Sequence, residues 1–339
     1  MITTEEQLED LLSTPSPEDV EALHSLEGPL LILGAAGKMG PSLARRARRA
    51  LDTAGNPARV IAVSRFSDPA SRALLESSGI VTIACELLEP GALDQLPGAP
   101  NVVFMAARKF GSTGNPGLTW AINTFLPGLV ARRYSGSRIA VFSSGNVYPL
   151  VPVESGGATE RTLPDPIGEY AQSVLGRERM FEHGSVEHGT PVSLLRLNYA
   201  VEPRYGVLVD IGRKVFEGRP VDVTMGHVNV IWQGDANSIT LRSLHHAASP
   251  PFILNLTGPE TLRVRDLAHE FARRFAREAI ITGAEQPTAL LNNAALCRQL
   301  FGPPSLSLSD LIDLIAHWIQ HGGRSLNKPT HFEMREGKF

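Results

Sequence analysis

The stretch Leu30-Leu-Ile-Leu-Gly-Ala-Ala-Gly-Lys-Met-Gly40 decides the fold of this chain. Its first four residues are apolar enough for a strand that is buried on both faces, and Gly34, Gly37 and Gly40 follow at spacings of three. Residues 42–54 then place apolar side chains on one stripe of a helix and arginines on most of the rest. Strand, glycine turn and helix predict a nucleotide cradle, because glycine lets the backbone approach a pyrophosphate whose charge the helix N-terminus meets.

Strand and helix signals alternate after this stretch. The predicted strands cover residues 59–64, 80–84, 101–106, 138–143 and 192–197, and the predicted helices cover 68–78, 118–134 and 170–182, with a loop at 183–189. Such alternation predicts an α/β fold with a parallel sheet covered by helices on both faces. Ligands bind such sheets at the carboxyl ends of the strands, so the residues directly after each strand are candidates for a site.

Composition and charge narrow the class of protein. The 339 residues are 42% hydrophobic and 20% charged, which allows a large buried core. A formal net charge of -3 does not favour a nucleic-acid partner, and the arginines within residues 45–49 are expected on a solvated helix face. Two distant cysteines, acidic first residues and the lack of a long apolar run favour a reduced, cytoplasmic setting without a signal peptide or a membrane span.

Residues 1–27 are expected to form a helical lead-in outside the nucleotide fold. Thr4 with Gln7, and Ser16 with Asp19, have the three-residue spacing of capping boxes, in which two side chains satisfy the first free N–H groups of a helix. The pattern therefore predicts two short helices, and it indicates no function for them.

Polar and small residues follow the second, third and fourth strands. Ser64 and Arg65 stand where dinucleotide folds usually carry an acid for the ribose 2′-hydroxyl. A hydroxyl and a guanidinium can hold a 2′-phosphate by charge-assisted hydrogen bonds, which favours NADP over NAD; a surface arginine near a turn is the alternative. Glu86, followed by Leu87, is placed to accept a hydrogen bond from the adenine amine, and the pair at 106–107 is small enough for a cofactor to lie against the backbone.

Two basic residues, Arg108 and Lys109, continue from the alanine pair into a glycine-rich loop at 110–117. Loops of this composition at the ligand-facing edge of a sheet can shape themselves around a ligand. We expect one of the two cations to hold a substrate carboxylate or phosphate. The alternative is a pair of exposed basic residues beside a flexible loop.

Taken in order, these motifs resemble the extended short-chain dehydrogenase/reductase superfamily, and within it the NAD-dependent epimerase/dehydratase family. The resemblance covers residues 29–320 and rests on the glycine motif, the alanine pair after the fourth strand, and Asn123 in the fourth helix. It also rests on later segments at 142–148, 170–174, 195–199, 230–235 and 255–258. The resemblance implies a Rossmann-type, doubly wound parallel sheet with a smaller C-terminal substrate-binding lobe.

The resemblance implies catalytic roles for Ser144, four residues before a Val-Tyr tyrosine, and for Tyr170, at the first position of a Tyr-x-x-x-Lys motif. The family's lysine is Val174 here. In the family this lysine bonds the nicotinamide ribose and lowers the pKa of the tyrosine. Arg177 is not expected to replace it, because seven residues of helix carry it about 10 Å along the axis, whereas Arg108 or Lys109 is a candidate replacement.

The resemblance also divides the chain. Residues 28–198 are expected to form the NAD(P)-binding domain, to which segments 229–247 and 252–256 return. Residues 199–228 and 257–339 are expected to form mainly the substrate-binding lobe and a C-terminal tail. Helices equivalent to 118–134 and 170–182 commonly pair two subunits in relatives, so a homodimer is expected.

The candidate site residues form two groups. Those expected at the cofactor are Gly34, Ala36, Gly37, Lys38, Met39, Gly40, Ser64, Arg65, Glu86, Leu87, Ala106, Ala107, Asn123, Tyr170 and Asn198. Those expected at the substrate are Arg108, Lys109, Ser144, Asn146, Tyr199, Arg204, His227 and Asn229. For the last three and for Tyr199 and Asn198, a purely structural role is the alternative.

The sequence thus predicts an NADP- or NAD-dependent enzyme that transfers hydride to or from a hydroxyl or ketone of a sugar or sugar-derived substrate. The missing lysine favours an alternative, a degenerate NAD(P)-binding sensor or partner-binding protein. No metal is expected, because His317 and His321 share a helix face without an evident third ligand. Ser144 lacks the glycine of a nucleophile elbow two residues before it, which argues against a serine hydrolase.

Overall fold

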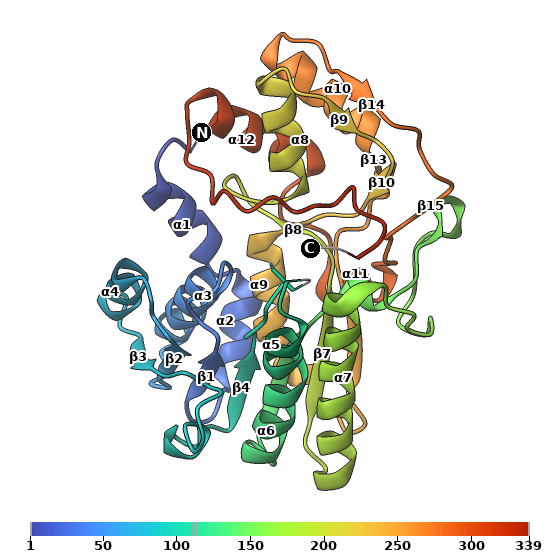
Figure 1. Ribbon diagram of the computed structural model, residues 1–339. Coiled ribbons are helices and arrows are strands. Elements are labelled where there is room, and N and C mark those ends of the chain that lie inside the picture. Colours follow the sequence, from blue (N-terminus) through green and yellow to red (C-terminus); the bar gives the residue numbers. More distant parts are fainter. Residues whose placement is uncertain (1, 110, 113, 338–339) are drawn as a thin grey trace.

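The apolar stretch after Pro29 forms strand β1 (Leu30–Leu33) within a seven-stranded parallel sheet of order β12-β7-β5-β4-β1-β2-β3 (Figure 1). The computed structural model describes residues 2–109, 111–112 and 114–337. The other strands of this sheet are β2 (Val60–Ser64), β3 (Val81–Ala84), β4 (Asn101–Phe104), β5 (Arg138–Ser144), β7 (Val192–Leu197) and β12 (Phe252–Leu256). The predicted α/β fold with a parallel sheet is confirmed.

Helices cover both faces of the sheet because alternate side chains of each strand point to opposite faces. Leu30 and Ile32 of β1 join one apolar cluster with α3 (Gly40–Thr53) and α9 (Gln233–Arg242). Leu31 and Leu33 join another with α6 (Leu126–Arg133) and α7 (Gly168–His188). The remaining helices of the described nucleotide-fold segments are α4 (Pro69–Ser77), α5 (Pro116–Trp120) and α11 (Ala295–Phe301). The strand that leads into the glycine turn is therefore buried between two apolar clusters, one on each face of the sheet.

Two helix predictions need correction. The helix expected at 118–134 is interrupted by a π-helical turn over Ala121–Phe125. The loop expected at 183–189 is helical to His188, and Gly189, at φ 65°, ends it. Gly184 stays inside α7 because a Cβ there would lie 2.9 Å from the Cβ of Ala131, so the glycine allows close packing of α7 on α6.

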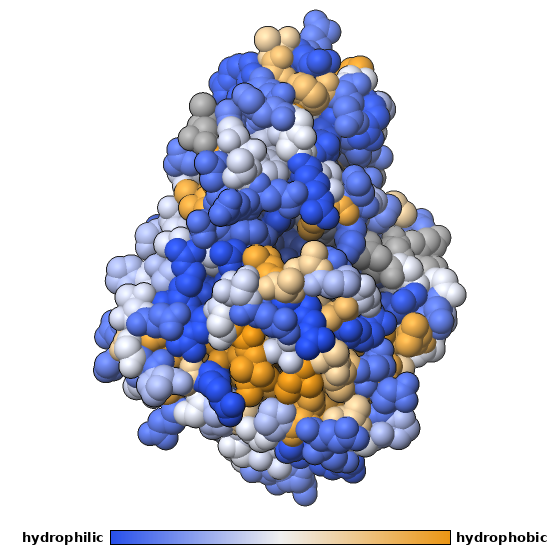
Figure 2. All heavy atoms as spheres, turned by 90° about the vertical axis from the view of Figure 1, so that its left-hand side faces the viewer, coloured by the Kyte–Doolittle hydropathy of each residue, from blue (hydrophilic) through white to orange (hydrophobic). Residues whose placement is uncertain are grey.

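A second lobe stands on the carboxyl edge of the sheet and is the narrower part of the molecule in the space-filling view (Figure 2). Its apolar core lies between α8 (Val207–Phe216), α10 (Val264–Phe275) and α12 (Leu308–Gln320). Short strand pairs complete it: β9 (Val221–Asp222) with β14 (Ile281–Thr282), and β10 (His227–Val228) with β13 (Leu262–Arg263). Two further pairs link the lobe to the sheet layer: β8 (Ala200–Val201) with β11 (Ile231–Trp232), and β6 (Val151–Pro152) with β15 (Thr288–Ala289).

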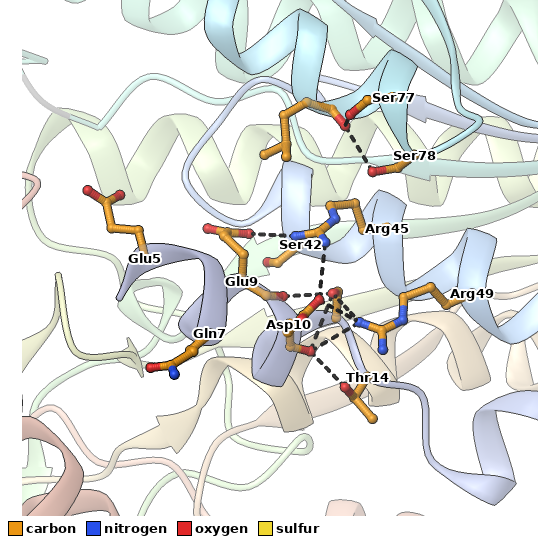
Figure 3. A network of polar contacts seen from close by, with 12 residues as sticks. Glu5, Gln7, Glu9, Asp10, Thr14, Ser42, Arg45, Arg49, Ser77 and Ser78 are labelled. Carbon is orange, nitrogen blue, oxygen red and sulfur yellow. Dashed lines mark hydrogen bonds and ion pairs between the residues drawn. The ribbon is translucent and has the colours of Figure 1, made fainter. Parts of the chain in front are cut away.

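The N-terminal segment forms α1 (Glu5–Ser13) and α2 (Pro17–His24), each with the predicted capping box. Both helices pack on α3, and Figure 3 shows Arg45 and Arg49 of α3 reaching Glu9 and Asp10 of α1. Arg46 is buried with its Nε 2.6 Å from Asp19. The solvated arginine face predicted for α3 is therefore wrong, because α1 and α2 cover it.

The C-terminal segment after α12 runs back across the molecule, in front of β8 (Figure 1). Its backbone is held at Leu326, whose N–H donates to the Arg204 carbonyl, and at Thr330, whose N–H donates to Asp210 at 2.8 Å. Phe332 is fully buried in the core of the second lobe, and Arg335 donates to the Thr288 carbonyl at 2.6 Å. This tail therefore closes the side of the second lobe that faces the sheet. In the described part of the chain, no helix is long and apolar enough to cross a membrane.

Candidate functional site

The glycine turn after β1 has two glycines that the backbone itself requires. Gly34 adopts φ 94°, and a Cβ there would lie 2.5 Å from the Ala106 backbone nitrogen. A Cβ at Gly40, where α3 begins, would lie 2.1 Å from the Ala35 carbonyl oxygen. Gly37 is different, because it is exposed and its added Cβ would meet only the Gly34 oxygen, at 3.3 Å. Gly37 is thus the glycine that keeps space open for a ligand.

A first compartment of about 540 Å³ opens in front of this turn, at the carboxyl ends of β1, β2, β3 and β4. It brings together these predicted cofactor residues: Gly34, Ala36, Gly37, Ser64, Arg65, Glu86, Leu87, Ala106 and Ala107. Arg108 and Lys109 line it as well, and the Nε of Arg108 is buried without a hydrogen-bond partner among the described residues. Phe110 and Thr113 of the predicted loop lie outside the described residues.

The end of this compartment beyond β2 is rich in hydroxyl groups. Ser64, Ser67 and Ser71 line it beside Arg65, and the Ser71 Oγ is buried with no hydrogen-bond partner in the part of the chain that the structure describes. The Arg65 guanidinium lies 3.7 Å from Glu86, and both side chains are largely exposed. An exposed pair at this distance holds its partners weakly. Arg65 is therefore available to another anion.

A second compartment of about 330 Å³ continues from the first and shares Gly37, Met105, Ala107, Lys109 and Lys328 with it. It brings together these predicted residues: Lys38, Met39, Lys109, Ser144, Asn146, Tyr170, Asn198 and Tyr199. Lys38 lines this second compartment and does not line the first. The cofactor contact predicted for Lys38 would require it to reach the first compartment. Its Nζ donates to the Ala200 carbonyl at 3.0 Å and lies 3.7 Å from the centre of the Tyr205 ring.

Ser144 and Tyr170 meet in the wall of this second compartment. Ser144 ends β5, where its Oγ accepts a hydrogen bond from the Asn146 N–H at 3.2 Å, and Tyr170 lies in the first turn of α7. Burial raises the pKa of the Tyr170 hydroxyl, while the charge of Arg177 and a hydrogen bond with Ser144 oppose that rise. The two hydroxyls thus share one polar contact in a largely buried setting.

Val174, where the resemblance predicts a lysine, is buried in an apolar cluster with Val147, Tyr148 and Ala158. Two other cations come close to Tyr170. The Nζ of Lys109 lies 5.8 Å from the centre of its ring, and Arg177 lines the same compartment. Arg177 reaches the site because its long side chain lies across the sheet edge, donating to the Phe142 carbonyl at 2.6 Å and the Ala106 carbonyl at 3.0 Å.

The expectation that Arg177 is too far along the helix is therefore wrong. Helical side chains point back toward the helix N-terminus, and this direction recovers part of the distance that the backbone rise creates. Burial lowers the pKa of Arg177 to about 10, so the guanidinium stays charged at neutral pH. Arg177 is a site residue that the sequence did not reveal.

Asn123 does not enter either compartment. It is fully buried in the π-helical turn, where its amide donates to the Arg108 carbonyl at 2.9 Å and accepts from the Arg108 N–H at 2.9 Å. It also accepts from Arg177 at 3.0 Å and donates to Ser173 at 3.0 Å. The predicted cofactor contact is corrected to a positioning role, because Asn123 fixes the backbone from which Arg108 and Lys109 extend. Gly40 is likewise confined to the turn itself.

Three predicted substrate residues lie outside both compartments. Arg204 is buried against Glu202 and Glu9, with its Nη2 2.7 Å from Glu9. His227 lies in β10, and Asn229 donates to the Glu260 carbonyl at 2.9 Å while accepting from the Asn292 N–H at 2.8 Å. All three positions are corrected to structural ones. The polar groups of Arg204 and Asn229 bond neighbouring carboxylates and backbone, and His227 lies away from both compartments, with its Nδ1 buried and unpartnered among the described residues.

A buried polar network supports the second compartment from below. Arg196 forms a bidentate pair with Glu178 and donates to the Tyr148 hydroxyl at 2.7 Å. Ser143, next to Ser144, bonds the same carboxylate of Glu178, and the Tyr148 hydroxyl donates to Asn255 at 2.9 Å. Charged groups paired this closely keep fixed geometry in a dry interior. The network therefore fixes the end of β5 on which Ser144 stands.

Sequence reasoning also missed Tyr205, Lys328 and Thr330 in the second compartment. The one signal in the sequence was the rarity of lysine, of which the chain has only five. Three of the four lysines that the structure describes line this compartment. His317 and His321 lie with ring centres 3.9 Å apart, and no group of three metal-ligand side chains exists among the described residues.

The model of the NAD dependent epimerase/dehydratase family matches residues 30–219. No curated protein sequence matches the chain. Among solved structures, UDP-glucuronic acid 4-epimerase from Bacillus cereus, in complex with UDP-glucuronic acid and NAD, has a TM-score of 0.71 at 18% identity, over 86% of this chain and 99% of that chain. UDP-glucose 4-epimerase from Thermotoga maritima, with UDP-glucose, has 0.71 at 15% identity, over 87% and 99%.

The UDP-glucose 4-epimerase of Thermus thermophilus, in complex with NAD, has a TM-score of 0.69 at 18% identity, over 86% of this chain and 99% of that chain. At these identities the likeness shows the fold. These matches confirm the predicted Rossmann-type parallel sheet.

Proposed function

The chain belongs to the NAD dependent epimerase/dehydratase family, and from this premise we propose that it transfers hydride between a nicotinamide cofactor and a hydroxyl or ketone of a sugar-like substrate. The observation that carries the proposal is the contact between Ser144 and Tyr170 in the second compartment, directly beyond the glycine turn. A protein that only binds the cofactor needs neither hydroxyl. The sugar-like class is supported by the UDP-sugars named with the solved structures.

The first compartment fits a dinucleotide. Gly37 leaves its surface open, the N-terminus of α3 faces the turn, and Ser71 and Arg108 each keep a buried polar atom without a partner in the described chain. Helix N-termini and charge-assisted donors favour phosphate groups. When bound, the nicotinamide of the cofactor supplies the hydride acceptor or donor.

Tyr170 moves the proton that accompanies hydride transfer, and Ser144 holds the substrate oxygen. A tyrosine with the ordinary pKa of about 10 is ionised to roughly one part in a thousand at pH 7, and burial makes ionisation of Tyr170 harder. The positive charge of Arg177 favours the phenolate and takes over part of the work of the family's lysine. The absence of that lysine therefore does not remove the electrostatic support of the tyrosine.

The cofactor is NAD or NADP, and the structure's hydroxyl-rich end favours NADP. Ser64, Arg65 and Ser71 line one end of the first compartment and would hold a 2′-phosphate there by charge-assisted hydrogen bonds, since the buried Ser71 hydroxyl has no hydrogen-bond partner within the described residues. Glu86 beside Arg65 is the feature that favours NAD, because its carboxylate repels a phosphate.

A second candidate function, a cofactor-binding sensor or partner-binding subunit, is favoured by one observation. Val174 is buried in an apolar cluster, so no lysine side chain at this helix position supports the tyrosine. This candidate predicts cofactor binding without turnover, and the first predicts both.

A homodimer through α5, α6 and α7 is part of the proposal. Phe125, in the π-helical turn between α5 and α6, is 59% exposed, and Val186 of α7 is 62% exposed; Leu118 and Trp120 of α5 add further exposed apolar surface. Exposed large apolar side chains on neighbouring helices are typical of subunit interfaces. Sedimentation of the purified protein, compared with a Phe125→Asp variant, should show a dimer that the substitution weakens.

The proposal is tested by calorimetric titration with NAD, NADH, NADP and NADPH after co-purified nucleotide is removed, followed by an absorbance assay of nicotinamide reduction with a panel of sugars. Tight binding with turnover supports the enzyme. Tight binding without turnover of any sugar class, anionic or neutral, supports the sensor. If none of the four nucleotides binds, both the enzyme and the sensor functions are overturned.

A further inference from the structure

The structure points to a substrate class for the second compartment: we propose that it takes a small molecule that carries a carboxylate or phosphate group and no attached nucleotide, with Lys38 and Lys109 as the anion's partners. The inference rests on the proposed function. It separates this chain from the structures named above, which were solved with UDP-sugars or nicotinamide cofactor.

The compartment is lined by positive charge from three distant segments. Lys38 comes from the glycine turn, Lys109 from the segment after β4, and Lys328 from the C-terminal tail. No aspartate or glutamate of the described chain lines the compartment, although Asp and Glu together outnumber Lys and Arg in the sequence. Since the chain holds only five lysines, their gathering at one small cavity marks it as a place for an anion.

Burial disfavours the charged forms of Lys38 and Lys109. It lowers the pKa of Lys38 to about 7 and that of Lys109 to about 8. Glu202 and Asp210 partly oppose this lowering for Lys38, and Asp210 does so for Lys109, whereas the charges of Lys109 and Arg204 lower the pKa of Lys38 further. An anion bound between the two ammonium groups would favour their charged forms. Affinity for such an anion should therefore fall as pH rises above about 8.

The position of Lys38 indicates that the anion belongs to the substrate and not to the cofactor. Its side chain lines the second compartment only, where it bridges from the glycine turn to Ala200 and the Tyr205 ring. Lys109 and Lys328 line both compartments and can serve either ligand. A change at Lys38 is consequently the one that separates the two ligands.

The size limit comes from the tail. Thr330 is bonded to Asp210 through both its N–H and its hydroxyl, and Phe332 is fully buried in the second lobe. Beyond Tyr199, the space next to Met334 and Arg335 has a volume of only about 30 Å³. A space of this size holds about two water molecules. The compartment of about 330 Å³ is thus sized for a sugar-sized molecule beside a nicotinamide, and its continuation past Tyr199 is too small for an attached nucleotide.

The test uses the full-length protein loaded with whichever nicotinamide nucleotide binds it most tightly. Calorimetry with glucose 6-phosphate, glucuronate, glucose and UDP-glucose compares a phosphate, a carboxylate, a neutral sugar and a nucleotide-linked sugar of related shape. We expect binding of glucose 6-phosphate or glucuronate, which also identifies the anion, and at least about tenfold weaker binding of the other two, as expected for loss of one charge-assisted contact. Tighter binding of glucose or UDP-glucose would overturn the proposal.

Variants locate the contact and separate its failure from that of the proposed function. Lys38→Met should weaken the anionic sugar about tenfold or more and leave the cofactor affinity unchanged, while Lys38→Arg, which keeps the charge, should retain most of the affinity. Lys214→Met, at a lysine outside the compartment that pairs with Glu333, is the matched control. Equal loss in the Lys38 and Lys214 variants would overturn the assignment.

The outcome for the anion does not depend on catalysis. Binding of an anionic sugar that Lys38→Met abolishes would support the anion site even if no turnover is found, in which case only the hydride-transfer function fails. Absence of anion binding to a protein that turns over a neutral sugar would overturn the anion site and leave the function standing.

Discussion

The two compartments of the cleft are built in different ways. The first is lined largely by backbone and small side chains that directly follow β1 to β4, such as Gly37 and Ala106. The second is lined by long side chains from segments far apart in the chain, including Lys38, Tyr170 and Lys328. A ligand held by backbone depends on the path of the strands, whereas a ligand held by long side chains depends on how each one is directed and buried.

This difference explains why relatives with little sequence identity share the fold. Strand ends and glycine turns are reproduced wherever the local pattern is kept, and Gly34 and Gly40 tolerate no Cβ because of backbone contacts alone. The second compartment can change its ligand by exchanging single side chains. Val174, where the resemblance places the family's lysine, is buried in an apolar cluster, while Arg177, three residues further along α7, lines the compartment.

The largest expected effect is at the reacting hydroxyl of the second compartment. Tyr170→Phe should reduce turnover about 10³-fold, within the range of general acid–base catalysis, and leave cofactor affinity unchanged. Steady-state rates and calorimetry measure the two. Tyr134→Phe, at a buried tyrosine that bonds Pro97 elsewhere, is the control. Equal rates in wild type and Tyr170→Phe would remove Tyr170 from the mechanism.

The cofactor role of the first compartment is tested at Gly37. Gly37→Val should weaken the cofactor about 10- to 100-fold, because overpacking costs about 1–3 kcal/mol, while thermal unfolding stays near the wild-type temperature. Gly98→Val, at an exposed glycine with nothing within 4 Å of its added Cβ, is the matched control. If the first compartment does not hold the cofactor, both variants will bind it equally.

A third prediction concerns Arg177, a buried residue that lines the second compartment. Arg177→Lys keeps the charge but loses the fork that bonds Phe142 and Ala106. We expect turnover at neutral pH to fall about tenfold, one pKa unit being a factor of ten for a group that must ionise.

The rising limb of the pH–rate profile should move to higher pH in that variant. A lysine at position 177 lacks the fork that holds the positive charge in place beside Tyr170, and the pKa of Tyr170 rises as that charge moves away. Arg196→Lys, in the supporting network below, controls for a loss of stability. A stability loss in Arg177→Lys with an unmoved pH profile would show that Arg177 is purely structural.

The smallest expected effect is at the exposed end of the first compartment. Arg65→Ala should weaken NADP roughly fivefold, the upper end for an exposed ion pair, and leave NAD unchanged or slightly improved. Arg72→Ala, an exposed arginine of α4 paired with Glu76, is the control. Equal effects on both nucleotides would show that Arg65 does not select a 2′-phosphate.

The sequence by itself determined the elements whose signals are local. The buried run of β1, the glycine turn and the two capping boxes depend on a few neighbouring residues, and each forms as its pattern predicts. Ser144 and Tyr170 were identified from motifs, and the parallel sheet brings them together because strand ends and helix starts meet at one edge.

Only the tertiary structure decided what the long polar side chains do. Arg46 was expected in solvent and Arg204 at the substrate. Both are instead buried in ion pairs, Arg46 with Asp19 of α2 and Arg204 with Glu9 of α1. Lys328 reaches the cleft because the tail folds back across the second lobe. The reason is physical: a backbone turn is set by its own residues, whereas the partner of a flexible charged side chain is set by whatever distant segment packs beside it.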